Sequence, residues 1–555
     1  MSSLPAPPAP RGLICLRIAT GAYLLAGLAT MLLLSPRTLY ADPWRFTGHF
    51  LTTPWPWKVL AADNGHREVF PNLVRVFELQ WLQANQWLQI GVGAGLALAT
   101  IAVLLRGIGR EPVLPSHRAA AALIAVLGVF WLGNERSLAH GNESVHAYLV
   151  TLCLAAGCWL ASDPTADRAH ARAGWLVLLG TVAAFSFGSG IACFAAFALV
   201  LLLRRAPWPQ IAIVAAGALI VAGLHLGLGD GGMSSAGVPT LSALLRWVSA
   251  PFVYAAWPLL DSSVAAQIPF APLRSACQWA AAVFENAFGP VRVAIWPNAL
   301  LGATGVAWLL KSTRVEWRHP QPSRMRQVGL GMAWFGLLVG ALVCTSRADY
   351  FLQYPAQVVA PRYLPWSSLF WSGLALCSAL RIRPERQGRP IAWALVLALV
   401  LIPSQAWMAM LAYRTQVLAE YTAVGVAVGV LAADTELGEN VPQEISTAVP
   451  PLRRAQAAMF AWPESKAIGR PLPTGAAAVA VDGLKLQPVG NLLGAPGYAL
   501  SFQLTDSPCR RLLLADASGT AVGMAIRSGG SGQWRGWARR AGASPQVYSL
   551  CTSEG

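Results

Sequence analysis

The chain has 555 residues, of which 55% are hydrophobic and only 12% are charged. A soluble globular protein has roughly a quarter of charged residues, so this composition indicates a polytopic protein of the membrane lipid bilayer. The net charge of +16 does not indicate a nucleic-acid partner, because the basic residues fall mostly in short loops between apolar segments, where membrane topology requires them.

The N-terminal region combines a Pro-rich start with a first apolar segment. We expect residues 1–11 to be disordered and cytoplasmic, and residues 12–34 to form a helix long enough to cross a bilayer. No small-residue cleavage site follows this helix directly, so it is predicted to be retained rather than removed as a signal peptide. The loop 35–87 then lies outside, and its second half, residues 73–87, is predicted as an interfacial helix.

Residues 12–410 are predicted to form a mainly α transmembrane bundle of about ten spans. Residues 175–203 carry no charge and are interrupted by the Gly/Ser-rich stretch 185–190. Two short helices that meet at an outer break satisfy the positive-inside rule better than one tilted helix, and broken helices are tolerated where they line a cavity. The pieces 241–260 and 273–288 lie in a long outer segment, so we expect interfacial or re-entrant helices there.

The C-terminal part is predicted to be extracytoplasmic. Residues 411–472 read as a helical linker, and residues 473–555 alternate apolar and polar side chains with a period of two, which predicts a small β-sandwich-like domain. Cys509 and Cys551 are the two cysteines of this domain and flank predicted strands. Because the compartment is oxidising in this topology, we predict a disulfide between them; the alternative is two free buried thiols.

The first outer loop carries an unusually polar motif, Asp63-Asn64-Gly65-His66-Arg67-Glu68-Val69-Phe70-Pro71. Such groups are costly beside a membrane unless they are paired, hydrated or used. They either cap one another in an interfacial loop or form the acid/base and anion-binding corner of an active site. The sequence contains no CxxC or His-rich metal pattern, so no metal ligands are predicted, and it leaves any cofactor unknown.

Further polar clusters fall on the same predicted side of the membrane. They are Asp42, Asn134/Glu135/Arg136/His140/Glu143, Ser186–Gly190, Arg347/Asp349 and Pro361-Arg362-Tyr363. Arginine can grip a phosphate by bidentate hydrogen bonds, and a carboxylate can take the proton from an attacking hydroxyl. Together these side chains suit an anionic, lipid-linked substrate. The simpler interpretation of Glu135 and Glu143 is that they pair with Arg136 or are hydrated.

The Asp63–Pro71 motif, the break at 185–190 and the Pro361-Arg362-Tyr363 sequence resemble a group of bacterial multi-pass proteins that look like GT-C class glycosyltransferases. The resemblance covers about residues 12–460. It implies transfer of a sugar from a polyprenyl-phosphate donor at the periplasmic face of the bacterial inner membrane. Members of the group often carry Asn-Glu-His-Arg where this chain has Asn64-Gly65-His66-Arg67, so the acid would have to come from Asp63 or Glu68.

Carried over to this chain, the resemblance makes Asp63 the first candidate for the catalytic base, Glu68 the second and Asp42 the third. The expected substrate-binding residues are His66, Arg67, Arg347, Arg362 and Tyr363. The arginines of the later segments would hold the lipid phosphate, and the tyrosine the sugar or the leaving oxygen. Against this, Arg362 could simply reach the interface ahead of the next helix, and His66 could make only a loop hydrogen bond.

Two other functions compete with a glycosyltransferase. A transporter of lipid-linked glycans would need ionisable groups near the middle of the membrane and internal repeats, and neither is convincing in this sequence. A non-catalytic cell-envelope assembly or sensor protein would use the β-domain outside the membrane, and the absence of Glu from the motif favours this alternative somewhat.

Overall fold

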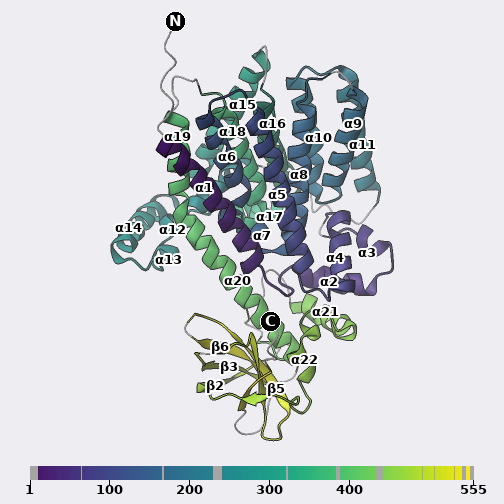
Figure 1. Ribbon diagram of the computed structural model, residues 1–555, viewed down its shortest axis with the longest axis vertical. Coiled ribbons are helices and arrows are strands. Elements are labelled where there is room, and N and C mark those ends of the chain that lie inside the picture. The colour runs from purple at the N-terminus through teal and green to yellow at the C-terminus, as the bar shows by residue number, and fades with distance from the viewer. Residues whose placement is uncertain are drawn as a thin grey trace. The chain divides into compact units, whose positions relative to one another are not determined.

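A computed structural model describes residues 10–63, 65–165, 168–228, 240–319, 323–382, 388–432, 435, 442–490, 492–494, 496–505, 507–530, 532–539 and 546–550 (Figure 1). Residues 1–9 of the expected disordered N-terminus lie outside this set. The chain divides into two compact units. The first, called here the helical unit, comprises Met1–Leu33, Leu60–Pro71 and Ile90–Met410; the second comprises Leu34–Val59, Asn72–Gln89 and Leu411–Gly555.

Most helices of the chain belong to the helical unit. They are α1 (Pro10–Ala29), α5 (Trp87–Arg110), α6 (Pro115–Phe130), α7 (Glu135–Ala139), α8 (Gly141–Ala161), α9 (Ala169–Ala184), α10 (Ala192–Leu203), α11 (Trp208–Gly227), α12 (Leu241–Leu260), α13 (Ser262–Ala265), α14 (Ala271–Phe288), α15 (Trp296–Arg318), α16 (Arg324–Ser346), α17 (Ala348–Gln353), α18 (Leu364–Ala379), α19 (Gly388–Val400) and the start of α20 (Ile402–Val428). A π-helical turn, Thr30–Leu34, extends α1.

Small residues let the central helices approach closely. Helix α16 packs on α18, α10, α8 and α12. At the α16–α18 contact, a Cβ on Gly373 would lie 2.3 Å from the Gly329 carbonyl oxygen, and one on Gly329 would lie 2.6 Å from that of Gly373. Backbones can meet at this distance only through glycine, which is the usual device of membrane helix bundles.

Eight helices among the described residues are long and apolar enough to cross a membrane. The bundle is therefore polytopic as predicted, with eight such helices where about ten spans were expected. Helix α12 is one of the eight, although its residues were expected to be interfacial or re-entrant. Helix α18, which covers an expected span, has 16 residues and is not among them.

The predicted interruption of the long apolar segment is present. Helix α9 ends at Ala184, a 3-10 turn covers Gly188–Ile191, and α10 begins at Ala192. A Cβ on Gly190 would lie 2.0 Å from the Ala183 carbonyl oxygen, so glycine is required for this reversal. The Phe185 carbonyl accepts the N–H of Phe70 (3.3 Å), which ties the polar first loop to the break.

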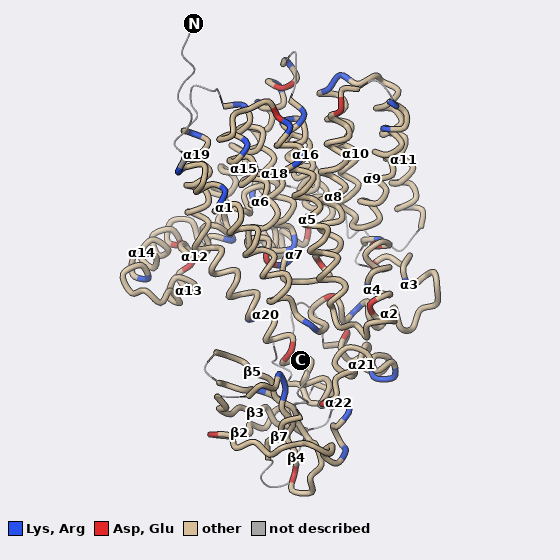
Figure 2. Tube along the Cα trace, in the orientation of Figure 1, with Lys and Arg blue, Asp and Glu red and all other residues tan. Residues whose placement is uncertain are grey.

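Lys and Arg residues gather at one end of the helical unit, where α8, α9, α10 and α16 meet their loops (Figure 2). Arg324 pairs with Asp163 (3.6 Å) just after the end of α8. Arg204 donates to the Asp163 carbonyl, and Arg172 donates to Thr165. Lys and Arg are concentrated in this way at the cytoplasmic ends of membrane helices.

The second unit contains short helices and the C-terminal sheet. Its helices are α2 (Pro43–Thr52), α3 (Trp57–Leu60), α4 (Val69–Trp81), α21 (Pro442–Ala455) and α22 (Pro463–Ala467), with some residues of α3, α4, α5 and α20 shared between the units. The strands are β1 (Ala477–Ala478), β2 (Asp482–Val489), β3 (Gly497–Gln503), β4 (Arg511–Ala515), β5 (Ala521–Arg527), β6 (Gln533–Arg539) and β7 (Gln546–Ser549).

The predicted β-sandwich-like domain is a single antiparallel sheet, in the order β1-β7-β4-β5-β6-β3-β2. One face buries a core of alternating residues that includes Leu500, Phe502, Leu512 and Trp534. The opposite face is covered by helices of the same unit, since α22 packs on β4 and β5 and the Trp537 indole donates to the Tyr421 carbonyl of α20 (2.9 Å). Helices therefore cover the face of the sheet that a second sheet would cover in a β-sandwich.

The cysteines divide into two groups. Seven are free thiols: Cys15, Cys153, Cys158, Cys193, Cys277, Cys344 and Cys377. Cys509 packs at the margin of the sheet core. Its expected partner, Cys551, lies outside the described residues, so the Cys509–Cys551 pairing stays a prediction.

Candidate functional site

The polar first loop folds as a tight turn. Asp63 and His66 exchange two backbone hydrogen bonds of 2.8 Å, and Gly65 between them has φ +78°. A residue with a side chain is strained in this left-handed conformation, so a glycine suits the position at which the related motif carries Glu. Asn64 lies outside the described residues.

The next two residues of the loop point into the protein. Arg67 is buried and donates from Nη1 to the Leu60 carbonyl (2.8 Å), which anchors the loop to its own start. Glu68 is also buried, and its Oε2 lies 3.7 Å from Nδ1 of His146. Glu68 is thereby joined to the charged groups of α8.

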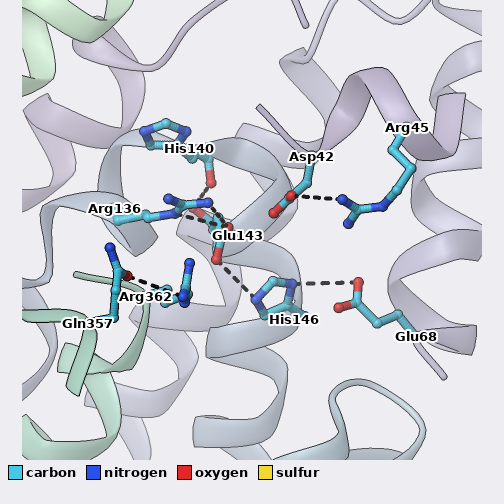
Figure 3. A network of polar contacts seen from close by, with 10 residues as sticks. Asp42, Arg45, Glu68, Arg136, His140, Glu143, His146, Gln357 and Arg362 are labelled. Carbon is cyan, nitrogen blue, oxygen red and sulfur yellow. Dashed lines mark hydrogen bonds and ion pairs between the residues drawn. The ribbon is translucent and has the colours of Figure 1, made fainter. Parts of the chain in front are cut away.

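The start of α8 supplies the centre of a chain of ionic contacts (Figure 3). Arg136 on α7 donates from Nε and Nη2 to Oε1 of Glu143, both at 3.2 Å. The other Glu143 oxygen lies 3.3 Å from Nε2 of His146. With Glu68 at the far side of the imidazole, four side chains form the order Arg136–Glu143–His146–Glu68. The expected Glu143–Arg136 pair is therefore confirmed.

Buried polar contacts hold α7 and the start of α8 in place. The Asn134 amide donates to the Gly128 carbonyl (3.2 Å), and its carbonyl oxygen accepts from Ser368 of α18 (2.9 Å). Ser144 donates to the Ser137 carbonyl (2.6 Å). These bonds fix the short segment that carries Arg136 against the helix that carries Glu143.

The break between α9 and α10 contributes an aromatic ring to the same place. Phe187 stacks on His146 with 4.6 Å between ring centroids and 9° between planes. Its centroid is also 4.2 Å from that of His66 and 6.1 Å from that of Trp366. A Cβ on Gly188 would lie 2.6 Å from Nδ1 of His66, so a glycine beside Phe187 makes room for the imidazole.

The later segments bring further arginines and two tyrosines. Arg362 donates to Oε1 of Gln357 (3.3 Å), and its guanidinium lies 5.1 Å from the Tyr363 ring centroid. The hydroxyls of Tyr363 and Tyr254 are buried and have no hydrogen-bond partner within the described part of the chain. The charges of Arg292, Glu135, Arg136 and Arg362 act on the Tyr254 hydroxyl, so α12 and α7 share this polar region with the Pro361–Tyr363 turn.

Burial dominates the electrostatics of the loop histidines. It lowers the pKa of His66 to about 4; the charges of Arg347 and His146 also lower this pKa, while Glu68 and Asp63 raise it. Burial likewise lowers the pKa of His140 to about 4, helped by Arg136 and opposed by Glu143. Both imidazoles are therefore neutral at pH 7, and Arg347 lies close enough to His66 for its charge to be felt there.

The structure brings together most of the residues singled out from the sequence. Asp63, His66, Arg67 and Glu68 share one loop, Arg347 acts on His66, and Arg362 and Tyr363 neighbour the Tyr254 region. Asp42 belongs to the second unit, where it precedes α2 and pairs with Arg45 (3.3 Å). Sequence reasoning missed His146, Tyr254 and Arg292, and it singled out the break that contains Phe187 without giving that ring a role. The i, i+3 spacing of Glu143 and His146 was a usable signal for the first of these.

The chemistry that this arrangement permits is acid/base catalysis beside an anion. Among the residues that the structure describes, no group of three or more His, Cys, Asp or Glu side chains is placed to hold a metal ion. Carboxylates that contact imidazole can accept a proton, and several arginines in the same region can bind a phosphate.

No family model matches the chain, and no curated protein matches it. Among solved structures, the chain is similar to the crystal structure of ArnT from Cupriavidus metallidurans bound to undecaprenyl phosphate. The match has 15% sequence identity and a TM-score of 0.35, and it covers 82% of this chain and 89% of ArnT. At this identity and TM-score, the likeness does not assign the chain to a family.

Proposed function

We propose that this protein is an integral membrane glycosyltransferase that takes a sugar from a polyprenyl-phosphate donor at the periplasmic face of the bacterial inner membrane. The observation that carries the proposal is the convergence of Glu68, the Arg136–Glu143–His146 chain and Arg347 at the polar loop. It unites a candidate base with candidate anion ligands, as the resemblance of the sequence motifs to GT-C class enzymes implies.

The length of α8 supports the placement of this site at a membrane face. Glu143 lies at the start of the 21-residue helix, and Asp163 with its partner Arg324 lies just after its end. At 1.5 Å per residue the helix spans about 30 Å, which is the thickness of the hydrocarbon core. The site and the arginine-rich end of the helical unit therefore suit opposite membrane faces, and the positive-inside rule assigns the arginine-rich end to the cytoplasm.

Glu68 is our choice for the base, ahead of Asp63, because it is buried and joined to the ionic chain. The acceptor oxygen would attack the anomeric carbon of the sugar and pass its proton to the Glu68 carboxylate. The bond from that carbon to the lipid phosphate breaks, and its electron pair leaves with the phosphate. Arg347 and Arg362 would neutralise the charge that develops on the phosphate, since fixed donors act strongly where water is excluded.

The remaining predicted residues take supporting roles in this proposal. His66, neutral at pH 7, would donate to or accept from the ligand, and Tyr363 would bind the sugar through its hydroxyl. Arg67 orients the loop through Leu60. Asp42 would have no part in the reaction, because its carboxylate pairs with Arg45 within the second unit. That unit would lie in the periplasm.

The experiment uses the full chain in nanodiscs with labelled polyprenyl-phosphate sugars and a panel of hydroxyl acceptors. We expect transfer by the wild type and a loss of about 10²- to 10⁴-fold in Glu68→Gln, the usual contribution of a general base. Asp42→Asn is the control and should retain transfer. Donor binding without turnover in the wild type would overturn the proposal and favour a non-catalytic envelope protein.

A further inference from the structure

His146 has no step of its own in the proposed reaction, although it lies beside the proposed base. Both nitrogens of its imidazole face carboxylate oxygens, with Nδ1 3.7 Å from Glu68 and Nε2 3.3 Å from Glu143. All three side chains are about nine-tenths buried. Figure 3 shows the ring lying between the two acids, which come from the first loop and from the helix of His146 itself.

Hydrogen-bond chemistry restricts the protons in such an arrangement. An ionised carboxylate can only accept, and a neutral imidazole has one donor and one acceptor nitrogen. If both acids are ionised, each nitrogen must carry a proton and His146 must be an imidazolium. If His146 is neutral, its unprotonated nitrogen faces a carboxylate oxygen, which is repulsive unless that acid carries the proton. The charge of His146 and the ionisation of Glu68 are therefore linked.

Neighbouring groups favour the imidazolium. Glu143 has one oxygen engaged by two Arg136 donors, which keeps it ionised and leaves its second oxygen for Nε2 of His146. The order of charges, Arg136 positive, Glu143 negative, His146 positive and Glu68 negative, alternates and sums to zero. The Phe187 ring stacks on the imidazole of His146. This stacking holds the imidazole in a plane in which its two nitrogens face the two acids. The His66 ring contacts the same Phe187 ring (4.2 Å between centroids), and the charge of His146 acts on His66.

We propose that His146 is a positioning residue that holds Glu68 ionised and correctly oriented in the resting protein, so that Glu68 is ready to accept a proton. The role of Glu68 as base rests on the proposed function, whereas the coupling of the two side chains does not. Nδ1 of His146 forms an ion pair with Oε2 of Glu68 at 3.7 Å, and Glu143 with Arg136 fixes the imidazole from the other side. In many functional sites a buried acid orients an imidazole through such a contact. Here we infer the reverse, that the imidazole orients the acid.

The proposal makes a specific prediction for pH dependence. A positive neighbour favours the ionised form of an acid, so loss of the imidazolium must raise the pH at which Glu68 ionises. The ionisable groups that face His146 are Glu68, Glu143 and His66, and Arg347 acts on His66. The transfer rate should rise on the acidic side of its pH profile as Glu68 ionises. A variant that raises the pH at which Glu68 ionises should therefore shift this acidic limb to higher pH.

The test measures Glu68 directly. Infrared difference spectra of the full chain in nanodiscs, Glu68-containing minus Glu68→Gln, give the carboxylate and carboxylic acid bands of this residue from pH 4 to 9. We expect His146→Gln to move the midpoint upward by at least one pH unit, and Glu143→Gln, a second variant should the first not fold, to move it in the same direction. His170→Gln, at an exposed position on α9, should leave it unchanged.

A kinetic readout separates this coupling from the proposed reaction. We expect His146→Gln to lower kcat at least 10-fold with less than a threefold change in KM, and to shift the acidic limb of the profile upward. An unmoved Glu68 midpoint in folded variants would overturn the positioning role. A moved midpoint in a protein that transfers no sugar would leave the coupling standing and refute the proposed function alone.

Discussion

Two buried acidic clusters of the helical unit are satisfied to different degrees. Glu316 is fully buried and receives Arg326 at 3.0 Å, Arg381 at 2.8 Å and the N–H of Ser323 at 3.1 Å. The candidate site has comparable ion pairs, but the hydroxyls of Tyr254 and Tyr363 in its polar region have no hydrogen-bond partner among the described residues.

Buried polar atoms in folded proteins are nearly always paired, so this difference is informative. Both oxygens of Glu316 accept donors, and this cluster stabilises the contact between α15, α16 and the end of α18. A cluster that contains buried hydroxyls without a hydrogen-bond partner can bind a ligand. The number of arginines therefore does not identify a binding site, whereas buried hydroxyls without a hydrogen-bond partner do.

The largest effect that we expect from this comparison is on stability. Glu316→Ala leaves the partly exposed Arg326 and Arg381 beside one another without their buried acid, and breaking a buried ion pair costs about 3 kcal/mol. Thermal unfolding in detergent or nanodiscs would measure the loss. Arg318→Ala, an exposed position on the same helix, is the control and should change stability by less than about 0.5 kcal/mol. A Glu316→Ala variant as stable as the wild type would contradict a structural role for this cluster.

The next effect is a loss of stability in acid. The folded-state pKa of His140 is about 4 because of burial, and that of an unfolded histidine is about 6.5. Between these values only the unfolded chain binds the proton, so stability is complete above about pH 6.5 and falls as the pH drops towards 4, by roughly 3 kcal/mol.

His140→Gln should flatten this dependence, and unfolding measured between pH 4 and 8 in both proteins would show it. The effect of pH on the wild type includes all other groups, so the difference between the two curves is the relevant quantity. Parallel curves would mean that His140 is protonated equally in both states, contrary to the burial described here.

A smaller effect is expected on substrate affinity. Arg362→Lys keeps the charge but removes the planar, forked donor geometry that suits a phosphate. We expect KM for a polyprenyl-phosphate donor to rise about 10-fold, equivalent to about 1.4 kcal/mol, with an unchanged melting temperature. Equal affinity in the two proteins would support the simpler interpretation, in which Arg362 only reaches the membrane interface.

The smallest expected effect compares two buried tyrosines. The Tyr23 hydroxyl donates to the Ala398 carbonyl (2.6 Å), so Tyr23→Phe should lower the free energy of unfolding by about 1 kcal/mol. Tyr254→Phe removes a hydroxyl without a described partner and should cost less than about 0.5 kcal/mol while weakening ligand binding. An equal loss of stability in both variants would show that the Tyr254 hydroxyl is already bonded within the protein.

Much of the fold followed from the sequence, because local patterns determine its elements. Alternating basic and apolar stretches predicted the helix bundle, the Gly/Ser run predicted the break before α10, and period-two alternation predicted the C-terminal strands. The predicted C-terminal strands form one antiparallel sheet, and helices from the stretch expected to be a linker cover one of its faces. Helix α12 is long and apolar enough to cross a membrane, and its expected interfacial or re-entrant position stays a prediction, because charge rules constrain the loops around a segment more than its depth in the membrane.

The candidate site was predictable only where the motif is continuous. The Asp63–Pro71 motif placed His66 and Glu68 together, but nothing local in the sequence showed that His146 would lie between Glu68 and Glu143. That contact depends on the packing of α8 against the first loop and on the ring of Phe187 from the break. Long-range contacts of this kind depend on the tertiary fold, which single-sequence patterns do not specify.

The most direct test of the central claim is the transfer rate of Glu68→Gln in nanodiscs with labelled polyprenyl-phosphate sugars, measured beside Asp42→Asn and the wild type. If the polar loop of the helical unit is a catalytic site, transfer falls by about 10²- to 10⁴-fold in Glu68→Gln and persists in Asp42→Asn, with all three proteins folded. Undiminished transfer by Glu68→Gln would contradict the assignment of the base, and its absence from the wild type would contradict the enzyme itself.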